Sequence, residues 1–552
     1  MRAPRRARPR ERSKQNLTLN VISHHDALVQ SPGREDRHRG RAVRRAPARG
    51  GGPGAQIHLR RGRRVGPNTA SVSRYRLNGK WRTSDDDHTL PVISPVDGSV
   101  VGSVHEYTHE EIDLVFATAR QAQPHWFARP LTERTDLLVR FAHRLAEKAA
   151  EIGDLLMMEV AKARKDARDE VIRSADYIRH TAEDTKRIIG ETQFSDAFPG
   201  QARDKLAIVH RVPLGTVLAI PPFNYPVNLA VSKIAPALAT GNAVVLKPPS
   251  QGALTALKVC ELAYQVGIPP EVLQVVTGRG SRIGDYLVQH EGVNMITFTG
   301  SSDTGADLAR KAGMVPLLLE LGGKDPAIVL ADADLEAAAD DIVAGAFSYS
   351  GQRCTAIKRV LVMESVADRV VAAIAERTGR LTVGDPREDA KITPLVDPGA
   401  AAGAEKMVQE ALARGGVLVH GGTREGNLMQ PTVVDHVTEE MDLAWVEPFA
   451  PVLPIIRVSS PAEAIRLSNR SEYGLQAAVF TRDIDAAIQI AARLDVGTVQ
   501  VNGRTARGPD HFPFLGTKAS GMGTQGVRPS IEAMTRVKSL VVNLRAKNLA
   551  MN

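Results

Sequence analysis

The sequence predicts an α/β protein whose sheets are parallel and buried. Short apolar runs such as T-V-L-A-I, A-V-V-L-K and M-I-T-F-T-G alternate with helical segments between residues 211 and 323. Apolar strands separated by helices are typical of a parallel sheet covered on both faces, and this alternation is the pattern of a dinucleotide-binding domain. A second α/β unit follows from residue 325 to about residue 499. With 552 residues, the chain is long enough for two or three domains.

The positive charge of the chain is concentrated in its first 70 residues. They contain 18 Lys and Arg and 4 Asp and Glu, a net charge of +14, whereas the whole chain carries +9, so residues 71–552 carry −5. Residues 1 to about 73 are rich in Arg, Pro and Gly and are predicted to form a disordered extension. Targeting or weak nucleic-acid binding are the alternatives for this segment. The acidic remainder argues against nucleic-acid binding as the main role.

The composition also narrows the cellular setting. No window reaches the roughly 18 to 20 apolar residues of a membrane helix. The two cysteines are too few for a disulfide framework, which favours a reducing, cytoplasmic location.

The folded part is expected to begin near Tyr75 with short strands, and S-P-V-D-G-S-V-V-G-S-V is expected to hold a turn between two more. From residue 108 to about residue 189, apolar residues recur at three- and four-residue spacing, which predicts helices. Residues 191–207 are expected to form a polar hairpin, and V-K-S-L-V-V-N-L near the C-terminus a strand. Helices of the alternating region are expected over residues 226–240, 251–265 and 281–290.

Cys354 lies in the segment F-S-Y-S-G-Q-R-C-T-A-I-K-R-V, residues 347–360. A cysteine in a small, polar loop is a candidate nucleophile. Gly351 lets the backbone turn tightly beside the sulfur, and we expect the positive charge of Arg353 to favour the thiolate. The alternative for a single cysteine is a small buried hydrophobe.

The segment L-L-L-E-L-G-G-K-D-P, which begins at Leu317, supports the nucleophile. It places Glu320 inside an apolar run that ends in a Gly-Gly turn. A poorly solvated carboxylate suits a general base. A nucleophilic cysteine and a carboxylate base are the two parts of an acyl-enzyme cycle.

The motifs E-L-G-G-K, G-Q-R-C-T and E-P-F, in this order, resemble the aldehyde dehydrogenase superfamily, and the resemblance runs from about Tyr75 to Leu544. P-P-F-N-Y-P-V-N-L at Pro221, G-Q-R-C-T-A-I-K-R-V at Gly351 and R-G-P-D-H-F-P-F-L-G at Arg507 are similar to one branch of it. Members of that branch oxidise glyceraldehyde 3-phosphate with NADP and add no phosphate.

The resemblance implies how the chain is divided. Residues 74–189 and 208–319 would form the cofactor-binding domain, and residues 320–506 the α/β catalytic domain. Residues 190–207 and 507–545 would form a small β oligomerisation hairpin and strand with the C-terminal tail. The expected assembly is a homo-oligomer, with a tetramer preferred and a dimer left open.

Lys247 and Ser250 are the residues that favour NADP over NAD. Lys247 follows a strand at its carboxyl end, where such folds bind ligands, and Ser250 is expected to open the next helix. A lysine and a helix N-terminus suit a 2′-phosphate. The alternative is a surface lysine beside an ordinary helix cap.

The rest of the cofactor site is expected at two further places. Gly300 and Ser301 open a helix that can face the pyrophosphate, and Gly305 permits close packing there. The resemblance implies that Glu447 and Phe449 contact the nicotinamide ribose and ring. Ala450 stands where the family usually has Gly.

Asn224, in P-F-N-Y-P, is the candidate oxyanion donor. Its amide and the backbone N–H of Cys354 can donate to the oxyanion that develops on the substrate. The alternative is an Asx turn before Pro226.

A phosphorylated aldehyde also requires cations beyond its reacting carbon. Arg353 precedes the nucleophile and Arg507 opens the tail loop. The resemblance implies that Arg173 and Tyr225 complete a phosphate pocket, since arginine holds phosphate through planar, paired donors. Any one of these residues alone is more often a surface charge.

The sequence therefore predicts oxidation of glyceraldehyde 3-phosphate to 3-phosphoglycerate with NADP, through a thiohemiacetal and a thioester on Cys354. Another small aldehyde, such as lactaldehyde or succinate semialdehyde, is the alternative, because a carboxylate-bearing substrate would also use arginines. No metal is expected, since no His/Cys cluster has ligand spacing.

Overall fold

The computed structural model describes residues 74–77, 80–188 and 190–544. All described residues belong to one unit of the chain, Pro67–Asn552. The predicted disordered extension, with its targeting and nucleic-acid alternatives, lies outside the described residues. Within the described part of the chain, no helix is long and apolar enough to cross a membrane.

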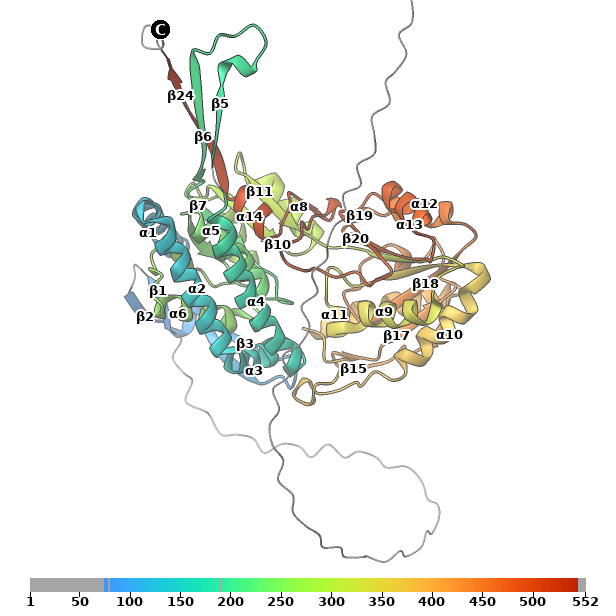
Figure 1. The fold of residues 1–552 in the computed structure, drawn as a ribbon. Coiled ribbons are helices and arrows are strands. Elements are labelled where there is room, and N and C mark those ends of the chain that lie inside the picture. Colours follow the sequence, from blue (N-terminus) through green and yellow to red (C-terminus); the bar gives the residue numbers. More distant parts are fainter. Residues whose placement is uncertain (1–73, 78–79, 189, 545–552) are drawn as a thin grey trace, which may run out of the picture. The chain divides into compact units, whose positions relative to one another are not determined.

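The described part of this unit opens with two antiparallel hairpins and four helices (Figure 1). The first helix begins at a capping box, in which Thr108 Oγ1 accepts from the backbone N–H of Glu111 and the Glu111 carboxylate accepts from the backbone N–H of Thr108. The strands and helices expected over residues 75–189 are confirmed. They are β1 (Arg74–Leu77), β2 (Lys80–Thr83), β3 (Thr89–Ile93), β4 (Val100–His105), α1 (His109–Ala128), α2 (Leu131–Glu147), α3 (Ala149–Val160) and α4 (Arg164–Thr185).

A six-stranded sheet in the order β23-β11-β10-β7-β8-β9 forms the first core. All neighbours are parallel except β23, which pairs antiparallel with β11. The predicted alternation is confirmed, and the strands are separated by helices. The elements are β7 (Thr216–Ile220), α5 (Asn228–Ala239), β8 (Ala243–Leu246), α6 (Ala253–Gln265), β9 (Leu273–Val275), α7 (Gly280–Gln289), β10 (Met295–Thr299), α8 (Ser302–Lys311), β11 (Leu317–Glu320) and β23 (Gly521–Met522).

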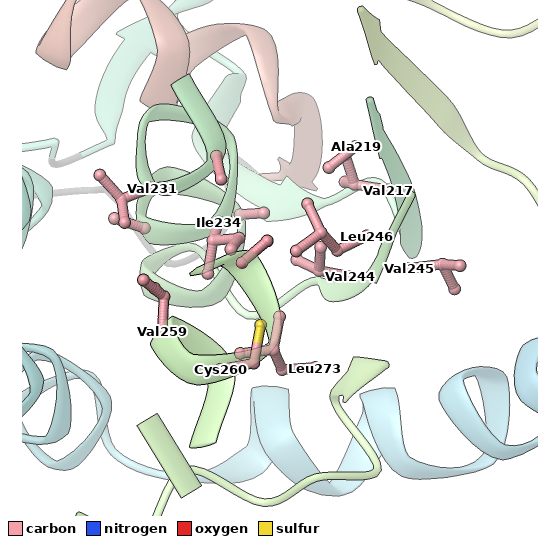
Figure 2. Packing of buried hydrophobic residues seen from close by; sticks show 14 of the residues in the cluster. Val217, Ala219, Val231, Ile234, Val244, Val245, Leu246, Val259, Cys260 and Leu273 are labelled. Atoms are coloured by element: carbon pink, nitrogen blue, oxygen red, sulfur yellow. The ribbon is translucent and has the colours of Figure 1, made fainter. Parts of the chain in front are cut away.

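The core of this sheet is apolar on both faces, as a parallel sheet requires (Figure 2). Val244 and Leu246 of β8 pack with Ile234 of α5 and Val259 of α6, and each is at most 1 % exposed. Burying one such side chain stabilises the fold by roughly 1.5 to 3 kcal/mol. Cys260, the second cysteine, belongs to this packed cluster and lies on α6.

A seven-stranded sheet in the order β14-β17-β18-β13-β12-β20-β21 forms the second core. Its strands are parallel except β14, which pairs antiparallel with β17. The elements are β12 (Pro326–Val329), α9 (Leu335–Phe347), β13 (Arg359–Met363), α10 (Ala367–Thr378), α11 (Pro398–Ala413), β14 (Val417–His420), β17 (Thr432–Asp435), β18 (Val452–Val458), α12 (Pro461–Arg470), β20 (Gln476–Phe480), α13 (Ile484–Arg493) and β21 (Thr498–Val501).

The expected hairpin and the expected C-terminal strand meet in a three-stranded antiparallel sheet of order β24-β6-β5. β5 (Glu191–Phe194), β6 (Lys205–Pro213) and β24 (Thr535–Asn543) lie side by side in Figure 1. The sheet and the connection between β5 and β6 leave apolar side chains exposed, among them Phe198 of the connection and Val537 and Leu540 of β24 at 56 to 70 %. Exposed apolar patches of this kind mark contact surfaces.

Short elements complete the described fold. They are α14 (Val527–Ala533), β15 (Arg424–Glu425) with β16 (Leu428–Met429), β19 (Tyr473–Gly474) with β22 (Thr517–Lys518), and the 3₁₀ turns η1 (Asp86–His88), η2 (Ser195–Ala197), η3 (Ser348–Gly351), η4 (Glu364–Val366), η5 (Pro386–Glu388) and η6 (Asp442–Ala444).

Candidate active site

A strained turn presents Cys354. Tyr349, Ser350 and Gly351 follow α9 with φ of +51°, +52° and +70°, a left-handed run that residues with a side chain rarely adopt. A Cβ on Gly351 would lie 2.2 Å from the carbonyl oxygen of Ala450, so only glycine fits. Cys354 is partly exposed, although the residues on both sides of it are buried. The turn thus gives the thiol access that its neighbours lack.

Glu320, the last residue of β11, faces this thiol. Its Oε1 lies 3.8 Å from the Sγ of Cys354, and its side chain is 2 % exposed. Its other oxygen, Oε2, accepts a hydrogen bond of 2.7 Å from Nη1 of Arg507. The carboxylate therefore lies between the sulfur and a guanidinium. It is close enough to accept a proton from the thiol or from a water molecule beside the thiol.

Asn224 lies between β7 and α5 and contacts the nucleophile loop. Its Nδ2 donates to the carbonyl oxygen of Gln352 at 2.9 Å, so the amide points at the loop that carries Cys354 and is not used in a local turn. A side-chain N–H in this position is close to where an oxyanion on a Cys354 adduct would form.

Two buried residues that the sequence did not single out hold Asn224 in place. The ammonium of Lys162 donates to the carbonyl oxygen of Asn224 at 2.6 Å and pairs with Glu170. The Glu170 carboxylate also accepts from the backbone N–H groups of Val227 and Asn228, at the start of α5. Both charged side chains are at most 4 % exposed, and nothing in their local sequence distinguishes them from surface charges of a helix.

The charges near Cys354 differ from the expectation. Burial first, and then the charge of Glu320, raise the pKa of the Cys354 thiol to about 12, and Lys358 acts in the opposite direction. The Arg353 guanidinium instead donates to Ser348 Oγ and to the carbonyl oxygens of Gly345, Thr355 and Thr505. The expectation that Arg353 supplies the charge that favours the thiolate is therefore corrected, because its guanidinium is already engaged by these acceptors.

One cavity opens on Cys354 from the side of the first sheet. Four predicted cofactor residues line it, namely Gly300, Ser301, Glu447 and Phe449, as do Asn224 and Cys354 itself. Ser301 caps the N-terminus of α8, its Oγ accepting from the backbone N–H of Thr304 at 3.3 Å. A Cβ on Gly305 would lie 2.4 Å from Leu321, so this glycine allows the close packing expected there.

Of the remaining two cofactor residues, Ser250 lines a neighbouring cavity, which shares Pro249 with the first, and Lys247 lines neither of the two. Lys247 directly follows β8 and is 8 % exposed; burial lowers the pKa of its ammonium to about 8. No hydrogen bond or ion pair links that ammonium to another described residue. Ser250 lines the cavity but does not cap a helix.

The expected helix start at Ser250 is therefore corrected. α6 begins at Ala253 with Gly252 at its cap, and Gly252 has φ of +96°. The helix begins late because Pro248 and Pro249 keep the chain non-helical, and the left-handed glycine then makes the turn into α6.

A second cavity also reaches Cys354, which is the one lining residue that it shares with the first, and the four predicted substrate residues line it. They are Arg173, Tyr225, Arg353 and Arg507, and Glu320 lines the cavity with them. Because both cavities reach Cys354, a substrate and a cofactor can approach the sulfur from different directions.

Two of these arginines, Arg173 and Arg507, are joined by Asp510, which the sequence did not single out. Arg173 donates to the Asp510 carboxylate from Nε at 2.6 Å and from Nη2 at 2.7 Å. Its Nη2 also donates to the carbonyl oxygen of Arg507 at 2.9 Å, and Nε of Arg507 lies 3.7 Å from Asp510. The only sequence signal for Asp510 is that it follows Arg507 by three residues.

In the described residues, no three His, Cys, Asp or Glu side chains gather closely enough to hold a metal ion.

A model of the aldehyde dehydrogenase family matches residues 81–540. The NADP-dependent glyceraldehyde-3-phosphate dehydrogenase of Streptococcus equinus is 51 % identical over 468 residues, 85 % of this chain and 98 % of the relative. The enzyme of that name from Triticum aestivum is 50 % identical over 482 residues, 87 % of this chain and 97 % of the relative.

A solved structure agrees with these matches. The NADP-dependent glyceraldehyde-3-phosphate dehydrogenase from Bacillus halodurans C-125, complexed with NADP, is 53 % identical and superposes with a TM-score of 0.85. The match covers 86 % of this chain and all of that chain. The chain belongs to the aldehyde dehydrogenase family.

Proposed function

We propose that the protein oxidises glyceraldehyde 3-phosphate to 3-phosphoglycerate with NADP and without adding phosphate. The observation that carries this proposal is the identity of about 50 % to relatives of that name over nearly their whole length. The cavity that joins Cys354 and Glu320 to Arg173, Tyr225 and Arg507 supports it, because a phosphate group beyond the reacting carbon needs such donors.

Cys354 is proposed as the nucleophile. Its thiolate attacks the aldehyde carbon and forms a C–S bond, and the carbonyl oxygen becomes an oxyanion. Nδ2 of Asn224 and the backbone N–H of Cys354 donate to that oxyanion. NADP, when bound, supplies the acceptor for the hydride that leaves the same carbon, and a thioester on Cys354 results.

Glu320 is proposed as the base that completes the cycle. It takes a proton from water, the resulting hydroxide attacks the thioester carbon, and the C–S bond breaks to release the carboxylic acid. Its position supports this role, because Oε1 already lies 3.8 Å from Sγ and the carboxylate is nearly inaccessible to bulk water.

The residues near the cavity lined by Gly300 and near the one lined by Ser250 fit NADP. The buried ammonium of Lys247, which pairs with no other described residue, is suited to a 2′-phosphate, and Ser250 follows it by three residues. Gly300 and Ser301, at the N-terminus of α8, would hold the pyrophosphate with their backbone N–H groups. At the Cys354 end of the cavity, Glu447 and Phe449 would contact the nicotinamide ribose and ring, and Gly305 keeps α8 close to Leu321.

Arg507, Arg173 and Tyr225 are proposed to hold the substrate phosphate. Arg353 lines the same cavity, and we propose that it contributes charge there, although its donors are largely occupied by carbonyl oxygens of the protein. The alternative substrates, lactaldehyde and succinate semialdehyde, would leave the phosphate contacts unused or replace them with carboxylate contacts.

A substrate panel tests the proposal. The full chain is given each aldehyde with NADP or NAD and no inorganic phosphate, and the reduced cofactor is followed by absorbance. We expect the highest kcat/KM with glyceraldehyde 3-phosphate and NADP. A higher value with lactaldehyde or succinate semialdehyde would contradict the proposed substrate, and activity that requires added phosphate would contradict the hydrolytic step.

We also propose the domain division given above and a homotetrameric assembly. The supporting observation is the three-stranded sheet of residues 191–213 and 535–543, which exposes apolar side chains that a partner subunit would cover. A cytoplasmic location is proposed on the cysteine usage. Analytical sedimentation of the full chain should give the mass of a tetramer. The mass of a dimer would contradict the proposed assembly.

A further inference from the structure

A buried ammonium lies directly behind the nucleophile. Lys358 is the residue before β13, and its side chain is 2 % exposed. Its Nζ donates to the backbone carbonyl oxygen of Cys354 at 2.5 Å and pairs with Oε1 of Glu447 at 2.9 Å. One cation therefore joins the residue that carries the thiol to an acid that lines the cofactor cavity.

The backbone around this contact leaves little freedom. The N–H of Lys358 donates to the carbonyl oxygen of Asp325 at 3.0 Å, where β12 and β13 begin to pair. The Gly-Gly turn after Glu320 provides the space. A Cβ on Gly322 would lie 2.3 Å from Oε2 of Glu447, and one on Gly323 would lie 3.0 Å from the carbonyl oxygen of Cys354.

Several charges near Cys354 are unfavourable to a thiolate. Glu320, Glu447 and Asp325 each disfavour a negative charge at the sulfur, whereas Lys358 and, more weakly, Arg507 favour it. Asp325 is the weakest of the three near neutral pH, because burial raises its pKa to about 7. The guanidinium of Arg353 is engaged elsewhere, as described above.

We propose that Lys358 is a positioning residue that favours the ionised form of Cys354, by neutralising Glu447 and by holding the carbonyl of the nucleophile's own residue. The role is electrostatic as well as geometric. A neutral side chain that kept the hydrogen bond to the carbonyl would hold the loop but would leave the Glu447 charge uncompensated beside the sulfur.

Two variants separate charge from geometry. Lys358→Gln keeps an N–H donor and loses the charge, whereas Lys358→Arg keeps the charge. The rate of alkylation of Cys354 by neutral iodoacetamide is measured against pH on the full chain without cofactor, and mass spectrometry identifies the modified cysteine. We expect the pH midpoint of the alkylation rate to be about one pH unit higher in Lys358→Gln than in the wild type. At a pH below the midpoint, the variant should then react roughly tenfold more slowly. The arginine variant should stay near the wild type.

Glu447→Gln and Lys324→Gln complete the test. Glu447→Gln removes the anion that Lys358 neutralises, so its midpoint should fall, which keeps the proposal testable even if Lys358→Gln does not fold. Lys324 is the control: it is 1 % exposed and donates to the carbonyl oxygen of Val446 at 2.7 Å, but no hydrogen bond or ion pair joins it to Cys354 or Glu447. Its glutamine variant should leave the midpoint unchanged.

Three results would overturn the proposal. They are an unchanged midpoint in folded Lys358→Gln, an unchanged or higher midpoint in Glu447→Gln, and a shift in Lys324→Gln as large as that in Lys358→Gln. The first would assign Lys358 a purely structural role. The third would show that any buried lysine in this region has the same effect. None of these measurements depends on the identity of the aldehyde.

Discussion

Arg173 and Arg507 are expected to respond differently to truncation, although both line the substrate cavity. Arg173 contacts Asp510 and the carbonyl of Arg507, whereas Arg507 also donates to the proposed base Glu320. Arg173→Ala should therefore lower kcat/KM only for a phosphorylated substrate. Arg507→Ala should lower kcat/KM for phosphorylated and unphosphorylated substrates alike, because it also removes the partner that orients Glu320.

The exposure of each side chain sets the magnitude. A charge-assisted contact to phosphate contributes about 1.5 to 3 kcal/mol. The side chain of Arg173 is 39 % exposed and that of Arg507 is 10 % exposed. Because solvent screens the more exposed Arg173, its loss should cost an energy at the lower end of this range and lower kcat/KM for the phosphorylated substrate roughly tenfold. The loss of the less exposed Arg507 should cost an energy at the upper end and lower the same kcat/KM roughly 150-fold.

The assay compares kcat/KM for glyceraldehyde 3-phosphate with that for unphosphorylated glyceraldehyde, in the wild type and in both variants. Arg173→Ala also leaves the Asp510 carboxylate unpaired, which would itself repel a phosphate. The double variant Arg173→Ala, Asp510→Asn is therefore the control, and the phosphate preference should stay reduced in it. The reasoning is refuted if Arg173→Ala lowers kcat/KM for both substrates by the same factor, or if the wild type does not prefer the phosphorylated aldehyde.

Three further predictions concern the nucleophile, the base and the cofactor. Cys354→Ser should abolish oxidation while Cys260→Ser retains it, since the second thiol is buried in an apolar cluster; full activity in the first variant would contradict the mechanism. Glu320→Gln should give a burst of reduced cofactor in rapid-quench measurements, then very slow turnover, because acylation no longer leads to hydrolysis; equal slowing of both phases would exclude Glu320 as the hydrolytic base. Because burial lowers the pKa of Lys247 to about 8, its charge is present below that pH and lost above it. The ratio of NAD to NADP dissociation constants should therefore fall as the pH rises from 7 to 9, and Lys247→Met should remove this trend; a trend that persists in the variant would show that another group recognises the 2′-phosphate.

The elements of the fold could be predicted from local patterns. Apolar runs such as T-V-L-A-I are buried in β7, and the periodic segment after residue 108 forms four helices. The order of the strands and the pairing of β6 with β24 could not be predicted, because these pairs join residues that are far apart in the sequence. The start of α6 at Ala253 also differed from the pattern, because a left-handed glycine overrides apolar spacing.

The sequence by itself determined which residues are the candidates for the chemistry, since Cys354, Glu320 and Asn224 stand in motifs whose residue types and order are specific. Only the tertiary structure decided their electrostatic surroundings. Arg353 is adjacent to Cys354 in the chain, yet its guanidinium binds carbonyl oxygens, while Lys358, four residues away, reaches back to the nucleophile. The physical reason is that a charge acts through distance and burial in space, and both depend on how separate strands and loops pack together.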